Sequence, residues 1–285
     1  MSHRFASTLL LVLLVASTFF VSVAVNASLE AGLRAKDRGH YATAIRAWKP
    51  LAKKGDARAQ NNIGHMYEEG LGVAQNYSEA MTWYKKAAES KLPEAQYNVG
   101  LLYYHGYGVA KNLREAIKWF KSSSRKNLPE AQYMMGLAHH EGKGVRLDYR
   151  EALSWFAKSA KQNHPPAQFM SGFMYQAGEG MEPDPMRAYA WSKLAELNKQ
   201  PESDAIYNLA ALSLDKKQVL QAQTVARMCF GSALTDCPLL KKGPLKVVID
   251  IDLAPPSETG TALRARQLKS AAKDAYEELT EKLGF

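Results

Sequence analysis

Apolar and small residues recur along this chain with two nested periods. Within short stretches they are spaced three and four residues apart, as on one face of an α-helix; in residues 94–105 that face holds Ala95, Val99, Gly100 and Tyr103. The whole pattern then repeats every 36 residues, four times, without an insertion or a deletion. Such a long, regular period predicts an all-α chain built from repeated pairs of helices.

Several columns of this repeat hold a single residue type. Glycine occupies one column (Gly64, Gly100, Gly136 and Gly172), and alanine occupies another (Ala80, Ala116, Ala152 and Ala188). Tryptophan occupies a third column (Trp83, Trp119, Trp155 and Trp191). Small residues on a helix face allow a second helix to approach closely, so we expect the glycine column to be a helix contact. The regular spacing of the tryptophans behind an alanine predicts that they belong to the core and not to a ligand cage.

Each unit is interrupted in its middle by a pair of glycines, Gly106 and Gly108 in the second unit. A glycine after a helix adopts the left-handed conformation that closes the last turn. Preferred N-cap residues follow in every unit, namely Asn76, Asn112, Asp148 and Asp184. Glutamate stands three positions later in the first three units, whereas Arg187 in the fourth predicts a weaker cap. Each unit is therefore predicted to be helix, glycine turn, helix, and stacked units bury what one hairpin cannot.

These columns resemble the Sel1-like repeat, a branch of the tetratricopeptide-like repeats. In the second unit the signature is Ala95-Gln96, Gly100, Tyr103, Gly106-x-Gly108-Val109 and Ala116-x-x-Trp119-Phe120. The resemblance covers about residues 55–200 and implies a right-handed α-solenoid of stacked helix-turn-helix repeats with helical caps and a short non-repeat C-terminal tail. The fourth unit departs most from the pattern, since Met181 replaces the valine and Ser192 replaces the aromatic residue.

Five segments are expected along the chain. They are a signal peptide (1–27), an N-terminal capping hairpin (28–54), four repeats (55–200), C-terminal capping helices with a cysteine pair (201–237), and an extended segment with a terminal helix (238–285). In the last segment, residues 245–253 alternate as a strand does. That stretch either lies along the solenoid or pairs with another chain.

The N-terminal residues predict export to the periplasm or the exterior. Arg4 precedes an apolar run, and Val25-Asn26-Ala27 fits a cleavage site, so we expect cleavage after Ala27 and only transient membrane contact. The alternative is an uncleaved anchor. In an oxidising compartment Cys229 and Cys237 are expected to form a disulfide, the alternative being two free thiols.

Charge and motifs narrow the function. The net charge is +9, spread over the repeats without a basic run, which favours an acidic protein partner or surface over nucleic acid. The sequence contains no nucleophile elbow, zinc-protease motif or phosphate loop, so we expect no catalytic residues and no cofactor. His105, His139 and His140 could approach one another across a stack, but a metal site would need a further ligand, and none is predicted.

Binding residues are expected where the repeat does not dictate the side chain. On the first helices this leaves a stripe that reads Asn62, His65 and Glu69, then Asn98, Leu101 and His105, then Met134, Leu137 and Glu141, then Met170, Phe173 and Ala177. By resemblance, first helices line the concave face of such solenoids. The stripe becomes apolar toward the C-terminal units, which either suits a peptide or helix partner or reflects packing between helices.

The function predicted from these features is a non-catalytic adaptor that binds a partner protein. The alternative is an enzyme, or an enzyme regulator, that acts on cell-wall material.

Overall fold

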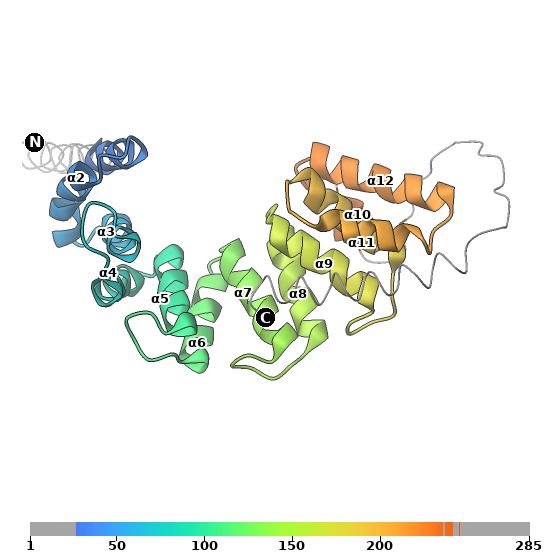
Figure 1. Cartoon of the computed structure of the whole chain (residues 1–285), viewed down its shortest axis with the longest axis horizontal. Helices are drawn as coiled ribbons and strands as arrows, with labels where there is room; N and C mark the ends of the chain where they lie inside the picture. Colours follow the sequence, from blue (N-terminus) through green and yellow to red (C-terminus); the bar gives the residue numbers. More distant parts are fainter. Residues whose placement is uncertain (1–26, 236, 242–244, 246–285) are drawn as a thin grey trace, which may run out of the picture. The chain divides into compact units, whose positions relative to one another are not determined.

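The structure is a computed structural model that describes residues 27–235, 237–241 and 245 (Figure 1). The expected signal peptide except its last residue, Ala27, lies outside the described residues, as do the 245–253 segment beyond its first residue and the expected terminal helix. Across the described ranges all regular elements are helical, which agrees with the predicted fold class. The chain divides into two compact units, Met1–Ser123 and Ser124–Phe285.

In the first unit, helical residues 27–37 are followed by α2 (Tyr41–Lys53), α3 (Ala57–Glu69), α4 (Tyr77–Glu89), α5 (Pro93–His105) and α6 (Leu113–Ser124). Each of α2, α3 and α4 packs against the helix that follows it. Trp48 of α2 is fully buried, and its indole N–H donates to the Leu29 carbonyl over 3.2 Å. This contact joins the first helical segment to α2.

The second unit contains α7 (Pro129–Glu141), α8 (Tyr149–Ala160), α9 (Pro165–Ala177), α10 (Pro185–Leu197), α11 (Ser203–Ala211), α12 (Lys216–Gly231) and the short 3₁₀ helix η1 (Pro238–Leu240). A disulfide joins Cys229 of α12 to Cys237, and both cysteines are buried. The disulfide therefore closes the loop that follows α12 covalently.

The turns between helices follow the local sequence signals. Gly70, Gly106, Gly142 and Gly178 end the first helices with φ angles of 68°, 82°, 69° and 72°. The side chains of Asn76 and Asp148 accept hydrogen bonds from the backbone N–H of the residue three positions on, at 3.0 Å each. These caps satisfy N–H groups that the helix itself leaves without partners.

The N-cap of α10 forms although Arg187 stands in place of the usual glutamate. Asp184 accepts from the Arg187 backbone N–H at 3.0 Å, as in the other units, so the cap forms. The buried Arg187 guanidinium donates to the carbonyls of Leu239 and Lys241, at 3.1 and 3.0 Å. The arginine that stands in place of the usual glutamate thus holds the segment that follows the disulfide.

The glycine column is a helix contact, as predicted. A Cβ atom added at Gly64, Gly100 or Gly136 would lie 2.7, 2.6 or 2.5 Å from the ring of Tyr84, Phe120 or Phe156 respectively. All three rings are fully buried. The first helix of each of the first three repeats therefore offers bare backbone to an aromatic ring of its second helix, whereas Gly172 of the fourth repeat faces Ser192.

The tryptophan column requires a correction. Trp191 is buried, but Trp83, Trp119 and Trp155 are only partly buried, and the deeply buried ring is the aromatic residue that follows each of these three. Trp83 packs against the cluster formed by residues 27–37, α2 and α3, and Trp119 against the cluster formed by α4 and α5. Lysine amines cover two of the rings: Lys86 lies 4.5 Å from the Trp83 centroid and Lys158 lies 3.8 Å from that of Trp155.

Candidate functional site

The first-helix stripe divides into an accessible part and a buried part. In the first compact unit, which holds the first two repeats of the stripe, Asn62, His65, Asn98 and Leu101 are partly exposed and His105 is exposed. In the second compact unit, Leu137, Met170 and Phe173 are buried, with 6%, 4% and 9% of their surface exposed. Met134 is partly buried and packs against the same core.

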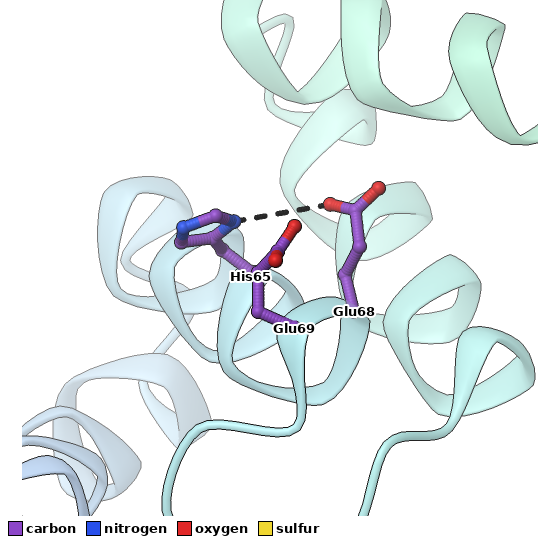
Figure 2. A group of neighbouring side chains, drawn as sticks. All are labelled: His65, Glu68 and Glu69. Atoms are coloured by element: carbon purple, nitrogen blue, oxygen red, sulfur yellow. Dashed lines mark ion pairs between the residues drawn. The ribbon is translucent and has the colours of Figure 1, made fainter.

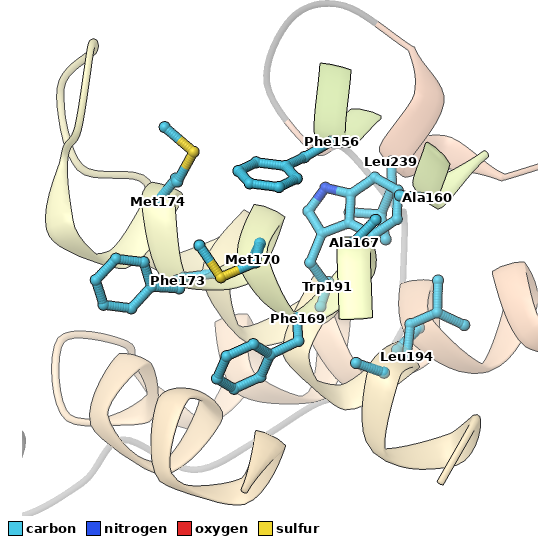
Figure 3. Packing of buried hydrophobic residues seen from close by; sticks show 14 of the residues in the cluster. Phe156, Ala160, Ala167, Phe169, Met170, Phe173, Met174, Trp191, Leu194 and Leu239 are labelled. Atoms are coloured by element: carbon cyan, nitrogen blue, oxygen red, sulfur yellow. The ribbon is translucent and has the colours of Figure 1, made fainter. Parts of the chain in front are cut away.

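Of the two alternatives for the apolar end of the stripe, a docking face or packing between helices, the burial of these residues favours packing. Met170 and Phe173 lie in one cluster with Met174 and Trp191 (Figure 3). The capping helix α11 packs against α9 as well as α10, so it covers the first helix of the fourth unit. The buried apolar residues there pack between helices, which leaves Leu137, Met170 and Phe173 little surface for a partner.

The accessible part in the first unit is a polar surface held by hydrogen bonds. The Asn98 amide of α5 donates to the Asn61 side-chain oxygen of α3 at 3.0 Å. On α3, His65 Nδ1 lies 3.9 Å from Glu68 Oε2. The same carboxylate oxygen accepts a hydrogen bond of 2.5 Å from the hydroxyl of the buried Tyr84. These contacts fix the side chains that border the stripe.

Charges on this surface act on one another. Burial raises the pKa of the Glu68 carboxyl, but hydrogen bonds with His65 and Tyr84, and the charges of His65 and His105, outweigh burial and hold that pKa below its ordinary value. Burial and the charge of Lys111 lower the pKa of His105, against the opposing charge of Glu68. Glu68 is therefore ionised at neutral pH.

Aromatic rings border the stripe at the end of α5. The His105 ring centroid lies 5.1 Å from that of Tyr104 and 5.1 Å from that of Tyr107. Tyr107, in the glycine turn, stacks on Tyr77 at 4.8 Å and remains 46% exposed. A partner that reaches His105 would also meet an exposed aromatic ring.

One group of side chains was missed in the sequence. His65, Glu68 and Glu69 project from the same side of α3 (Figure 2), and one potential ligand atom from each lies within 4.8 Å of the others. The signal was the spacing His-x-x-Glu-Glu, which places three metal-binding residue types on one helical turn. Of the histidines that the sequence suggested for a metal site, His140 of α7 instead pairs with Glu179 at 2.7 Å.

Stacked helix pairs define an α-solenoid repeat protein. A left-handed glycine ends the first helix of each pair, and in three of the four pairs a glycine packs against an aromatic ring. The Sel1 repeat model matches residues 57–92, 93–128, 129–164 and 165–198. The chain belongs to the Sel1 repeat proteins, as its columns predicted. Sel1 repeats generally serve as protein–protein interaction modules and are typically non-catalytic.

Two solved structures are similar over most of the chain. A Sel1 repeat protein from Oxalobacter formigenes is 29% identical, with a TM-score of 0.60, over 70% of this chain and 84% of that one. A protective antigen present in uropathogenic Escherichia coli strains, with an SLR fold, is 30% identical, with a TM-score of 0.62. That match covers 74% of this chain but 49% of the antigen, so this chain spans about half the antigen's length. The comparison with curated proteins gave no match.

Proposed function

We propose that this chain is a non-catalytic scaffold that binds a partner protein through the accessible part of the first-helix stripe in its first compact unit. The residues of this part are Asn62, His65, Asn98, Leu101 and His105. The observation that supports this proposal is the division of the stripe. The repeat fixes the glycine and alanine columns, whereas the stripe varies from repeat to repeat. Its positions on α3 and α5 are accessible, whereas Leu137, Met170 and Phe173 on α7 and α9 are buried. Function in an adaptor resides on such a surface rather than in a reactive group.

The chemistry of the stripe favours a hydrogen-bonding partner segment. An asparagine side chain offers two donors and two acceptor positions, and the Asn98–Asn61 pair uses one donor of Asn98 and one acceptor position of Asn61. Further donors and acceptors along α3 and α5 suit the backbone of an extended peptide. The exposed Tyr107 ring supplies apolar area of the kind that often anchors an interface.

Partner capture tests the surface directly. Exchanging Asn98 and His105 together for alanine should reduce capture of a stoichiometric partner from envelope extracts about 10-fold, a loss of about 1.4 kcal/mol. Both side chains are accessible, so the circular dichroism spectrum should not change. Asn208→Ala, an exposed asparagine on α11, is the matched control and should bind as the wild type does.

Equal capture by the double variant and the wild type would place the binding surface elsewhere. Turnover of cell-wall fragments by the purified chain would support the alternative function, an enzyme. Charge reversal at Lys158, on a second helix, should change the salt dependence of binding more than the affinity.

We propose further that the protein is exported to the periplasm or secreted. The N-terminal apolar run after Arg4 and the buried Cys229–Cys237 disulfide both support an oxidising destination. No helix among the described residues has the length and apolar character needed to cross a membrane.

Mass spectrometry of the exported protein, without reduction, should show a chain that begins at Ser28 and a peptide cross-linked through Cys229 and Cys237. Intact Met1 in a membrane fraction would indicate an anchored protein instead. Two cysteines that alkylate in the native exported protein would contradict the disulfide.

A further inference from the structure

We propose that His65, Glu68 and Glu69 of α3 form a binding site for a divalent transition-metal ion of the zinc class. One imidazole nitrogen and two carboxylate oxygens converge there, with the three candidate ligand atoms within 4.8 Å of one another (Figure 2). Imidazole together with carboxylate suits zinc and its neighbours in the first transition row, whereas Ca²⁺ and Mg²⁺ prefer oxygen ligands alone. The inference is independent of partner binding, because the ion would bind the isolated chain.

The geometry needs only small side-chain adjustments. Residues three and four positions apart lie on the same face of a helix, so the α3 backbone already brings the three side chains together. Zinc–ligand bonds of about 2.0–2.1 Å in a tetrahedral site keep ligand atoms roughly 3.4 Å apart. His65 Nδ1 and Glu68 Oε2 lie 3.9 Å apart, and the Glu69 side chain is exposed and able to rotate.

A buried neighbour orients one of the ligands. The Tyr84 hydroxyl donates to Glu68 Oε2 at 2.5 Å, and Tyr84 itself is fully buried against Gly64. The corresponding residues of the next two units are Phe120 and Phe156, which fill the same packing position without a hydroxyl. The hydroxyl is therefore not needed for packing, and it fixes Glu68 as hydrogen-bonded residues behind a metal ligand commonly do.

The ligand set is specific to the first repeat. The positions of His65, Glu68 and Glu69 correspond to Leu101, Tyr104 and His105 in the second repeat. In the third repeat they correspond to Leu137, His140 and Glu141. The solenoid fold thus does not require this triad. The His65 side chain is 43% exposed, so an ion can enter from solvent and keep a fourth coordination position for water or for a group from another molecule.

Isothermal titration calorimetry of the full chain, prepared without a histidine tag, tests the site with zinc chloride as the probe. We expect one ion per chain. His65→Asn should reduce the affinity at least 10-fold, and Glu69→Gln should act in the same direction. His40→Asn is the matched control, because His40 is exposed and lies outside this group.

Tyr84→Phe separates positioning from packing. It should weaken zinc binding about 10-fold or more, the usual effect of losing a hydrogen bond to a metal ligand. It should leave the fold intact, since phenylalanine occupies this position in the next two units. The proposal is overturned if zinc does not bind the wild type. It is also overturned if His65→Asn binds zinc as tightly as the wild type and the His40→Asn control do.

Discussion

Phe173→Ala should destabilise the second compact unit by about 3–5 kcal/mol, the usual cost of truncating a buried phenylalanine. Phe173 is only 9% exposed and belongs to the core formed by α8 to α12. Its removal leaves a cavity beside Met170 and Met174 (Figure 3). Urea unfolding followed by circular dichroism measures the loss.

Leu101→Ala is the matched control, because Leu101 occupies the same column in the second repeat and is partly exposed. It should cost clearly less stability than Phe173→Ala, since the cavity term is smaller where solvent can enter. If Phe173→Ala left stability unchanged and weakened partner capture instead, Phe173 would be a binding residue and not part of the core in solution.

The sequence predicted the repeat because a period of 36 residues carries its own evidence. Each column has one local cause: glycine for a close helix contact or a left-handed turn, and asparagine or aspartate for a cap. These causes act within one unit or between adjacent helices, so the chain alone reveals them. The glycine contacts at Gly64, Gly100 and Gly136 were therefore predicted correctly.

The identity of the buried ring could not be read from the period. Trp119 and Phe120 are adjacent on α6, about 100° apart around a helix that turns once in 3.6 residues, and both recur with the same spacing. Which ring faces the glycine depends on how the helix is rotated against its neighbour. That rotation places Phe120 over Gly100 and leaves Trp119 at the junction with the cluster of α4 and α5.

The division of the stripe into accessible and buried positions escaped prediction for a related reason. The repeat pattern treats all four first helices as equivalent, but α11 packs on α9 from outside the repeats. Burial in this column is therefore set by the helices that surround each first helix: Phe173 and Leu137 are buried, whereas His65 is partly exposed, and the column itself does not reveal this. The contribution of Tyr84 to Glu68 likewise joins residues on different helices, 16 positions apart.

Gly100→Leu should cost at least about 1–3 kcal/mol, because leucine overpacks a contact that has no free space. A single Cβ at Gly100 would already lie 2.6 Å from Phe120, and the remaining carbons of leucine would extend into the same ring. Either α5 and α6 separate or the phenyl ring leaves its position. Thermal and denaturant unfolding should both show the loss. Gly231→Leu is the control, because no atom lies within 4 Å of a Cβ added there.

Combining Gly100→Leu with Phe120→Ala separates overpacking from other effects of leucine. Removing the ring makes room for leucine, so the double variant should lose less stability than the sum of the two single losses. A coupling of about 0.5–3 kcal/mol is typical of residues in direct contact. Strict additivity would mean that Gly100 and Phe120 do not touch. The packing of glycine against an aromatic ring would then not be what holds the two helices of this repeat together.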